Sequence, residues 1–243
     1  MKKYIAVATV MFFMAAAHAQ VSSNLDIANP AQTNGIGQVR FTNADALGVK
    51  TTEQVKDADV DGSPYFDNRW LKAVVILSSN QAVKANKLKI DLYRNEVHYV
   101  DSLGTELIAV SGIVKRIYLY DSKDTTKISA VFEQIAGIDG NGTAFVQVLN
   151  NGNTKLLKFT HITVYKKGYD EVAGKDNYAF LAKPCYAMLK NGVVNNLKAL
   201  DEKAVLAVIM PSANDASWLL QNKNKLKSEK DVISFLSYYN GAK

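Results

Sequence analysis

Short apolar runs alternate with polar clusters through the middle of the chain. From Trp70 to Leu197 these runs are rich in Val, Ile, Tyr and Phe, and clusters of Asn, Gly, Asp and Ser separate them. Such runs are typical of β-strands, and their close spacing favours antiparallel hairpins over the longer helical crossovers of a parallel sheet. The expected strands are residues 70–77, 88–93, 96–100, 107–110, 114–120, 128–135, 145–149, 155–165, 178–181, 186–189 and 193–197.

Several joints between these strands carry turn residues. Asn and Gly tolerate the positive φ that tight hairpins require, and Asp favours turns through its side chain. The expected turns are residues 94–95, 101–104, 139–142, 150–153 and 191–192.

The hydrophobic period becomes helical after residue 200. Asp201 can cap a helix that extends to Met210, where Pro211 forces a break. A second helix is expected over residues 212–222.

A third helix is expected close to the C-terminus. Ser228 followed by Asp231 matches a capping box, and the apolar residues of 232–239 cover one helical face. Gly241 is a suitable C-cap.

Together these patterns predict an α+β protein. Residues 62–198 form an antiparallel β domain, either a sandwich or a partly closed barrel, and residues 199–243 form a helical C-terminal region. Residues 20–61 are rich in Asn, Asp, Ala, Thr and Gln, so we expect a poorly ordered or loosely attached segment, with only residues 37–42 suited to a short strand.

Residues 1–19 have the composition of a cleavable signal peptide. Lys2 and Lys3 supply the positive start, and residues 4–16 supply an apolar stretch that is too short to cross a bilayer. Ala-His-Ala then precedes Gln20, which fits the small-x-small rule for signal peptidase. We therefore expect export to the periplasm or the extracellular space, with no transmembrane segment after cleavage.

Charge and cysteine content limit the function classes. The formal net charge is +6, and basic pairs such as Lys166-Lys167 alternate with apolar residues and would face an exported compartment, so we expect no nucleic-acid partner. Cys185 is the single cysteine, so no internal disulfide can form. A lipoprotein needs a cysteine directly after the cut, and this chain has Gln20 there, so we do not expect a lipoprotein.

Four stretches together resemble a family of uncharacterised exported proteins of Bacteroidota-type bacteria. They are Gly62-Ser63-Pro64-Tyr65-Phe66 before Trp70, Leu92-Tyr93, Phe145 to Leu149 with Gly152 and Lys155 to Leu157, and Phe235 to Asn240. The resemblance covers roughly residues 62–240 and implies an exported, β-rich protein with a helical tail. It implies no activity and no site residue, and this chain departs from the family in its longer N-terminal segment.

Alternate carboxylates at Asp57, Asp59 and Asp61 match the first half of a calcium-binding loop. The second half does not match, because Pro64 stands where an EF-hand needs an aliphatic residue and Asn68 replaces the bidentate Glu. These three residues are the weak metal candidates of the sequence. A solvated acidic linker explains them better, so no metal site is predicted.

Two histidines and the cysteine are the remaining candidates for chemistry. Glu96 and His98 lie two apart on an expected strand and share a face, but two ligands do not make a metal site. His161 lies in a long expected strand, and Cys185 in an apolar stretch is typical of a small buried residue. With no recognisable catalytic motif, we predict no catalytic residue and no cofactor.

Aromatic side chains are the other possible binding signal, since tyrosines on strands can line a groove but serve equally well as core and cross-strand pairs. The aromatic candidates are Tyr65, Phe66, Trp70, Tyr118, Tyr120, Tyr165, Tyr169 and Tyr178. The leading hypothesis is a non-enzymatic envelope or extracellular module that binds an envelope protein or a small ligand through its sheet. The alternative is a secreted hydrolase that acts on cell-wall or sugar substrates, which would bring Glu, Asp and His side chains together in one pocket.

Overall fold

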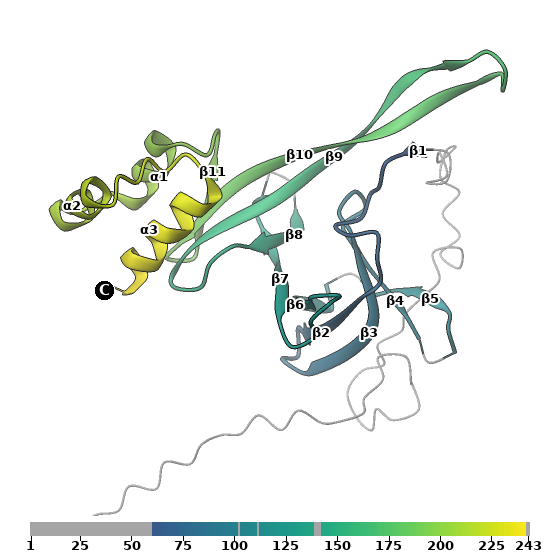
Figure 1. Ribbon diagram of the computed structural model, residues 1–243. Helices are drawn as coiled ribbons and strands as arrows, with labels where there is room; N and C mark the ends of the chain where they lie inside the picture. Colours follow the sequence, from purple (N-terminus) through teal and green to yellow (C-terminus); the bar gives the residue numbers. More distant parts are fainter. Residues whose placement is uncertain (1–59, 102, 111, 139–141, 242–243) are drawn as a thin grey trace, which may run out of the picture.

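The computed structural model describes residues 60–101, 103–110, 112–138 and 142–241, and the expected signal peptide lies outside these ranges. Strands are the main regular structure, and three helices follow them (Figure 1). The strands are β1 (Val60–Asp61), β2 (Leu71–Leu77), β3 (Ala82–Asp91), β4 (Glu96–Val100), β5 (Glu106–Ile108), β6 (Val114–Tyr120), β7 (Ile128–Ala136), β8 (Thr143–Val148), β9 (Thr154–Asp170), β10 (Lys175–Lys190) and β11 (Val193–Leu197). The helices are α1 (Glu202–Ile209), α2 (Ala213–Gln221) and α3 (Glu229–Gly241).

The predicted α+β class, a β domain followed by short helices, is confirmed. Within the described ranges the strands form one sheet in the order β1-β10-β9-β8-β7-β6-β2-β3-β4-β5, and β11 also pairs with β10. Neighbouring strands are antiparallel except β1 and β10, which run parallel, so the sheet is mixed. The folded body therefore includes Val60 and Asp61, two residues before the expected start of the β domain.

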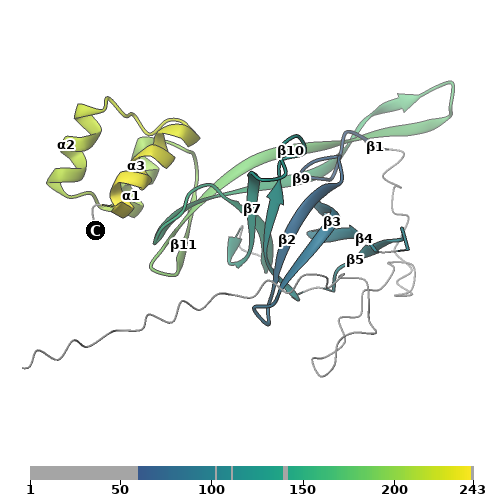
Figure 2. The ribbon, with the colours of Figure 1, turned by 60° about the horizontal axis from the view of Figure 1, so that its bottom comes forward.

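The part of the sheet from β2 to β8 curls around one hydrophobic core (Figure 2). Asn95, in the turn between β3 and β4, has a φ of 57°. Its side-chain amide donates to the Thr143 carbonyl at 2.9 Å and accepts from the Phe145 amide at 2.7 Å. The turn is thereby held against β8. The sheet is not closed, but this curl is nearer to the partly closed barrel than to the sandwich among the two expected forms.

The two longest strands, β9 and β10, form a hairpin that extends well beyond the rest of the sheet (Figures 1 and 2). We call residues 154–159 and 185–190 the hairpin base, and residues 160–184 the arm. The helices gather at the base, and the arm points away from them. Among the strand residues of the arm, only Ile162 and Ala179 are buried.

Two of the expected strands, residues 178–181 and 186–189, are parts of the single strand β10. The expected break fell at Pro184, which cannot donate a ladder hydrogen bond. In the structure Pro184 pairs with Thr160 of β9, between the segments of β10 that pair with β1 and β11. A proline is tolerated on a strand that has one free edge, so the break was wrong.

The expected N-terminal caps of α1 and α3 are confirmed, whereas the expected C-cap Gly241 is wrong, because Gly241 is the last residue of α3 and has no positive φ. The Asp201 carboxylate accepts from the Ala204 amide at 2.8 Å at the start of α1. Ser212 and Asp215 form a reciprocal capping box at the start of α2. The Asp231 amide donates to the Ser228 hydroxyl at 3.2 Å at the start of α3. These local contacts satisfy backbone groups that the first helical turn leaves unpaired.

The helices cover one face of the hairpin base. Leu156 and Met188 are fully buried against them, and Phe235 of α3 lies in the same cluster. The Asn240 side chain binds the backbone of Thr154 through two hydrogen bonds, of 3.0 Å and 2.9 Å, and so fastens the end of α3 to β9. No helix in the described ranges has the length and apolar character needed to cross a membrane.

Candidate functional site

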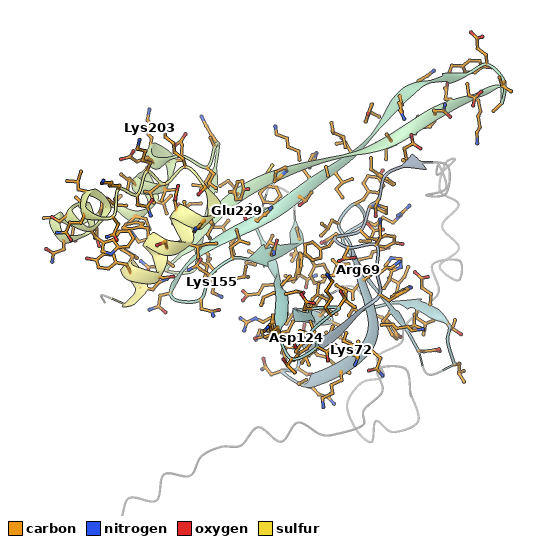
Figure 3. The ribbon with its side chains drawn as sticks, in the orientation of Figure 1. Arg69, Lys72, Asp124, Lys155, Lys203 and Glu229 are labelled. Atoms are coloured by element: carbon orange, nitrogen blue, oxygen red, sulfur yellow. The ribbon has the colours of Figure 1, made fainter. Side chains whose placement is uncertain are left out.

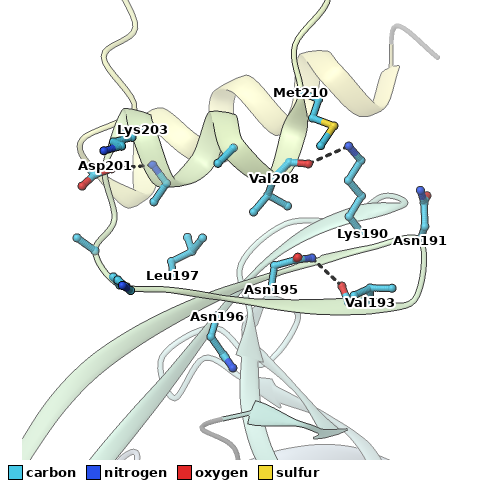
Figure 4. Close-up of a pocket in the computed structure, with 14 residues that line it drawn as sticks. Lys190, Asn191, Val193, Asn195, Asn196, Leu197, Asp201, Lys203, Val208 and Met210 are labelled. Atoms are coloured by element: carbon cyan, nitrogen blue, oxygen red, sulfur yellow. Dashed lines mark hydrogen bonds between the residues drawn. The ribbon is translucent and has the colours of Figure 1, made fainter.

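A groove of about 890 Å³ lies between α1 and the strand β11 (Figure 4). It is formed by the end of β10, the turn to β11, β11 itself, the connection that follows, and α1. The lining residues are Lys190, Asn191, Val193, Asn195, Asn196, Leu197, Lys198, Ala199, Asp201, Lys203, Ala204, Ala207, Val208 and Met210. A space of this size falls in the range of ligand pockets.

The turn between β10 and β11 gives the groove its shape. Asn191 and Gly192 both have positive φ, of 52° and 79°, as a tight hairpin turn requires. Successive β11 side chains then point to opposite faces. Leu197 packs with the helices, whereas Val194 packs on the other face with the cluster that contains Ile138. The asparagines follow the same alternation, with Asn195 directed toward α1 and Asn196 away from it (Figure 4).

Two charged side chains of the groove, Lys190 and Asp201, form hydrogen bonds with the backbone of α1. The Lys190 ammonium donates to the carbonyls of Val208 at 2.9 Å and Ile209 at 2.7 Å, which belong to the last turn of the helix. A cation at this end also interacts favourably with the helix dipole. Asp201 caps the opposite end. The Lys190 contacts tie the last turn of α1 to the end of β10.

Two further lysines of the groove remain available. Lys198 and Lys203 are exposed, and neither has a hydrogen-bond or ion-pair partner among the described residues. Lys203 lies at the helical end of the molecule (Figure 3). Apolar side chains complete the walls, including Val193, which is 60% exposed, and Met210, which is 80% exposed. The groove is therefore amphipathic and positively charged.

Strand β11 is an edge strand. In the part of the chain that the structure describes, it pairs with β10 and with no other strand. An edge strand presents backbone N–H and C=O groups that another extended segment can pair with. In this chain the edge borders the amphipathic groove (Figure 4).

The weak calcium candidates do not form a group in the described structure. Asp57 and Asp59 lie outside the described residues. Asp61 lies on β1, and its carboxylate accepts from the Lys167 ammonium at 2.7 Å. The contact joins β1 to the arm.

Glu96 and His98 do lie together, and the fold adds Asp91 to them. One ligand atom from each of the three lies within 4.8 Å of the others. Asp91 was not among the predicted site residues, although its place three residues before the expected turn at residues 94–95 indicates that it lies close to β4. His161 is exposed on β9, in the arm, and pairs with Lys183. The fold does not bring it to Glu96 and His98.

The other candidate residues serve packing or face solvent. Cys185 is a free, half-buried thiol in the hairpin base. Phe66 packs edge-on against Phe132 with ring centroids 4.8 Å apart. Tyr165 and Tyr169 are exposed on the arm. None of the eight aromatic candidates lines the groove under α1.

Comparison of the chain with protein-family models, with curated proteins and with solved structures finds no match.

Proposed function

We propose that this chain is an exported, non-enzymatic protein that binds a partner through the groove between α1 and β11. The occupant is an extended, acidic segment of another envelope protein, which adds a strand to the edge of β11 and lays alternate apolar side chains in the groove. Strand addition of this kind draws affinity from backbone hydrogen bonds and specificity from the flanking pockets. The observation that carries the proposal is the position of an unpaired strand edge beside an amphipathic groove.

Charge supports an acidic occupant. Lys198 and Lys203 have no partner among the described residues, and Asp201 is engaged with the start of α1. Complementary charge at the rim of an interface speeds association and selects the partner. The exposed Val193 and Met210 side chains supply apolar surface for the occupant.

The separation of His161 from Glu96 and His98 favours a binding role over the hydrolase alternative. His161 lies in the arm, and the groove contains neither histidine nor glutamate among its lining residues. A hydrolase would need an acid and a base in one pocket. Export follows from the predicted signal peptide and from the resemblance to exported proteins, and mass spectrometry of the secreted chain would test it by finding Gln20 at the N-terminus.

A synthetic peptide tests the groove directly. The probe is a fluorescent peptide of about eight residues, the length of a typical strand, with alternating Val and Asp. We expect saturable binding by fluorescence anisotropy. The double variant Lys198→Glu with Lys203→Glu should weaken it at least about tenfold, because both available cations become anions. A peptide with alternating Val and Lys should not bind.

A remote double variant provides the matched control. Lys72 and Lys84 are exposed on β2 and β3, in the curled part of the sheet (Figure 3 labels Lys72). Lys72→Glu with Lys84→Glu makes the same change in net charge and should leave binding unchanged. Equal weakening by both double variants, or no binding by the wild-type chain, would contradict the proposal.

A further inference from the structure

The hairpin of β3 and β4 presents carboxylates and an imidazole on one face. Asp91 pairs with Glu96 across the two strands, and Glu96 and His98 are two residues apart on β4. Residues related in these ways project to the same side of a sheet. Their ligand atoms converge to within 4.8 Å of one another.

His98 is buried, with 8% of its surface exposed, and its two nitrogens have different surroundings. Nδ1 lies 2.8 Å from Oε1 of Glu106. A carboxylate only accepts hydrogen bonds, so the proton of this contact belongs to Nδ1, and Nε2 of the neutral ring carries a lone pair. Nε2 is shielded from solvent and makes no hydrogen bond within the described residues.

The Nε2 atom of His98, itself an acceptor, lies close to another acceptor, a carboxylate oxygen of Glu96. Oε2 of Glu96 lies 3.6 Å away, which is too long for a hydrogen bond. Two atoms bound at about 2.0–2.1 Å to one tetrahedral zinc ion lie roughly 3.4 Å apart. A cation between the two acceptors would therefore satisfy both without a large movement. It would also remove the cost of leaving a buried acceptor unsatisfied.

We propose that Asp91, Glu96 and His98 bind a divalent transition-metal ion of the zinc class, with Nε2 of His98 as the nitrogen ligand. Imidazole with carboxylates suits zinc and its neighbours, whereas calcium and magnesium prefer oxygen alone. Glu106 would act on the other side of the ring, because a carboxylate that accepts from Nδ1 fixes the tautomer and strengthens Nε2 as a ligand. This inference does not depend on the proposed peptide groove.

Two cations lie close to the cluster, and neither takes the place of the metal. The Arg94 backbone amide donates to Oδ1 of Asp91 at 2.8 Å, and its guanidinium donates to Oδ2 at 2.9 Å. Each carboxylate oxygen keeps a second lone pair, so these contacts orient Asp91 and leave it able to bind. The Lys89 ammonium lies over the rings of Tyr65 and Trp70, at 5.0 Å and 4.6 Å. The Glu96 side chain is 37% exposed and gives the ion a path from solvent.

Zinc titration of the untagged chain from Gln20 onward tests the proposal. Calorimetry with zinc chloride should give one ion per chain, and Co²⁺ should bind at the same site with a visible absorption spectrum. Glu96→Gln and His98→Gln should each weaken binding at least about tenfold, and Glu106→Gln should weaken it about 10–100-fold through the imidazole. His161→Gln is the matched control and should leave the affinity unchanged.

Circular dichroism of every variant checks that the fold is retained. If His98→Gln does not fold, Glu96→Gln decides the matter, because its partly exposed amide keeps the size of the original side chain. The proposal is overturned if zinc does not bind saturably to the wild-type chain. It is overturned equally if a folded Glu96→Gln variant binds as tightly as the wild type, or if His161→Gln weakens binding as much as Glu96→Gln.

Discussion

The base and the arm of the β9–β10 hairpin share one hydrogen-bond ladder, but their surroundings differ. In the base, Leu157 and Ala187 are fully buried against the cluster of Ile138 and Val146, and the helices cover the opposite face. In the arm, Leu181 is 56% exposed although the same ladder continues through it. Backbone pairing therefore sets the strands, whereas the burial of their side chains depends on the layers that cover them.

A two-stranded hairpin alone is marginally stable in water, so the arm depends on its base. The charged contacts of the base and of the arm also differ in their exposure to solvent. Glu229, at the start of α3 where the helix meets the base (Figure 3), accepts from Lys158 at 2.8 Å and from the Tyr186 hydroxyl at 2.6 Å. Lys167 of the arm and Asp61 of β1 form an ion pair whose side chains are 58% and 65% exposed.

Truncation of a leucine should have the largest effect and should differ most between the two regions. Leu157→Ala in the base should lower the free energy of unfolding by about 2–5 kcal/mol, because it leaves a cavity between buried layers. Leu181→Ala in the arm is the matched control and should change it by less than about 0.5 kcal/mol. Urea unfolding followed by circular dichroism measures both. Similar losses would show that the arm is covered as well as the base.

Glycine substitution at the turns of the base should have the next largest effect. Gly152, before β9, has a φ of 121°, and an added Cβ would overlap the side chain of Asn240. Gly152→Ala should therefore cost about 2–4 kcal/mol through strain and overpacking. Gly192, before β11, has a φ of 79° and open space around it, so Gly192→Ala should cost only about 1–2 kcal/mol. Equal costs, measured by urea unfolding, would mean that Asn240 moves aside freely.

Alkaline pH should weaken the contact between α3 and the base. Burial, together with the hydrogen bond to Glu229, raises the pKa of Tyr186 from 10.0 to about 12. A raised pKa stabilises the fold fully below pH 10, and that stabilisation is lost as the pH rises from 10 to about 12. Tyr186→Phe should cost about 1–2 kcal/mol at neutral pH and should remove this part of the pH dependence. An alkaline limb that is the same in Tyr186→Phe and the wild type would contradict this role.

At acidic pH, the contribution of Glu229 to stability changes with pH in the opposite direction to that of Tyr186. Burial opposes ionisation of Glu229, but the hydrogen bonds from Lys158 and Tyr186 outweigh it and hold the pKa of Glu229 below its ordinary value of 4.5. A lowered pKa stabilises the fold above that value, and the stabilisation is lost as the pH falls further. Glu229→Gln should flatten the acidic limb of the unfolding profile, and an unchanged acidic limb would refute this role.

Removal of the arm's ion pair should have the smallest effect. Lys167→Ala should leave the midpoint of thermal unfolding unchanged, because the exposed charges are screened by salt and water. Lys158→Ala in the base is the comparison, and it should lower the midpoint because it removes a partner of the half-buried Glu229. A clear drop for Lys167→Ala would show that β1 depends on this contact.

Part of the candidate metal site could be predicted from the turn between β3 and β4. A two-residue turn at residues 94–95 would place Asp91 opposite His98. The actual loop is longer, so Asp91 lies opposite Glu96. The expected and the observed register differ from each other by two residues, so Asp91 lies on the same face of the hairpin in both. The face could be predicted from the sequence, but the register and the pairing of β5 that brings Glu106 to His98 could not.

The groove under α1 could not be predicted from the sequence, for a different reason. The helix cap at Asp201 and the turn at Asn191 are local signals and were expected. Val205 and Ile209 pack α1 into the cluster that covers the base, and Lys190 donates from the end of β10 to the last carbonyls of the helix. No periodicity in the sequence encodes such a contact, because it joins side chain and backbone across two elements.

Local signals in the sequence account for most strands of the β domain, the three C-terminal helices and the N-terminal caps of α1 and α3, because hydrophobic period, turn residues and capping side chains act over a few neighbouring positions. The tertiary structure alone decided that residues 178–181 and 186–189 form one strand, that Leu157 is buried while Leu181 is exposed, and that Asp91 and Glu106 join His98. Each of these outcomes depends on which distant segments pack together. The free energy of that packing comes from surfaces that meet only in the folded chain.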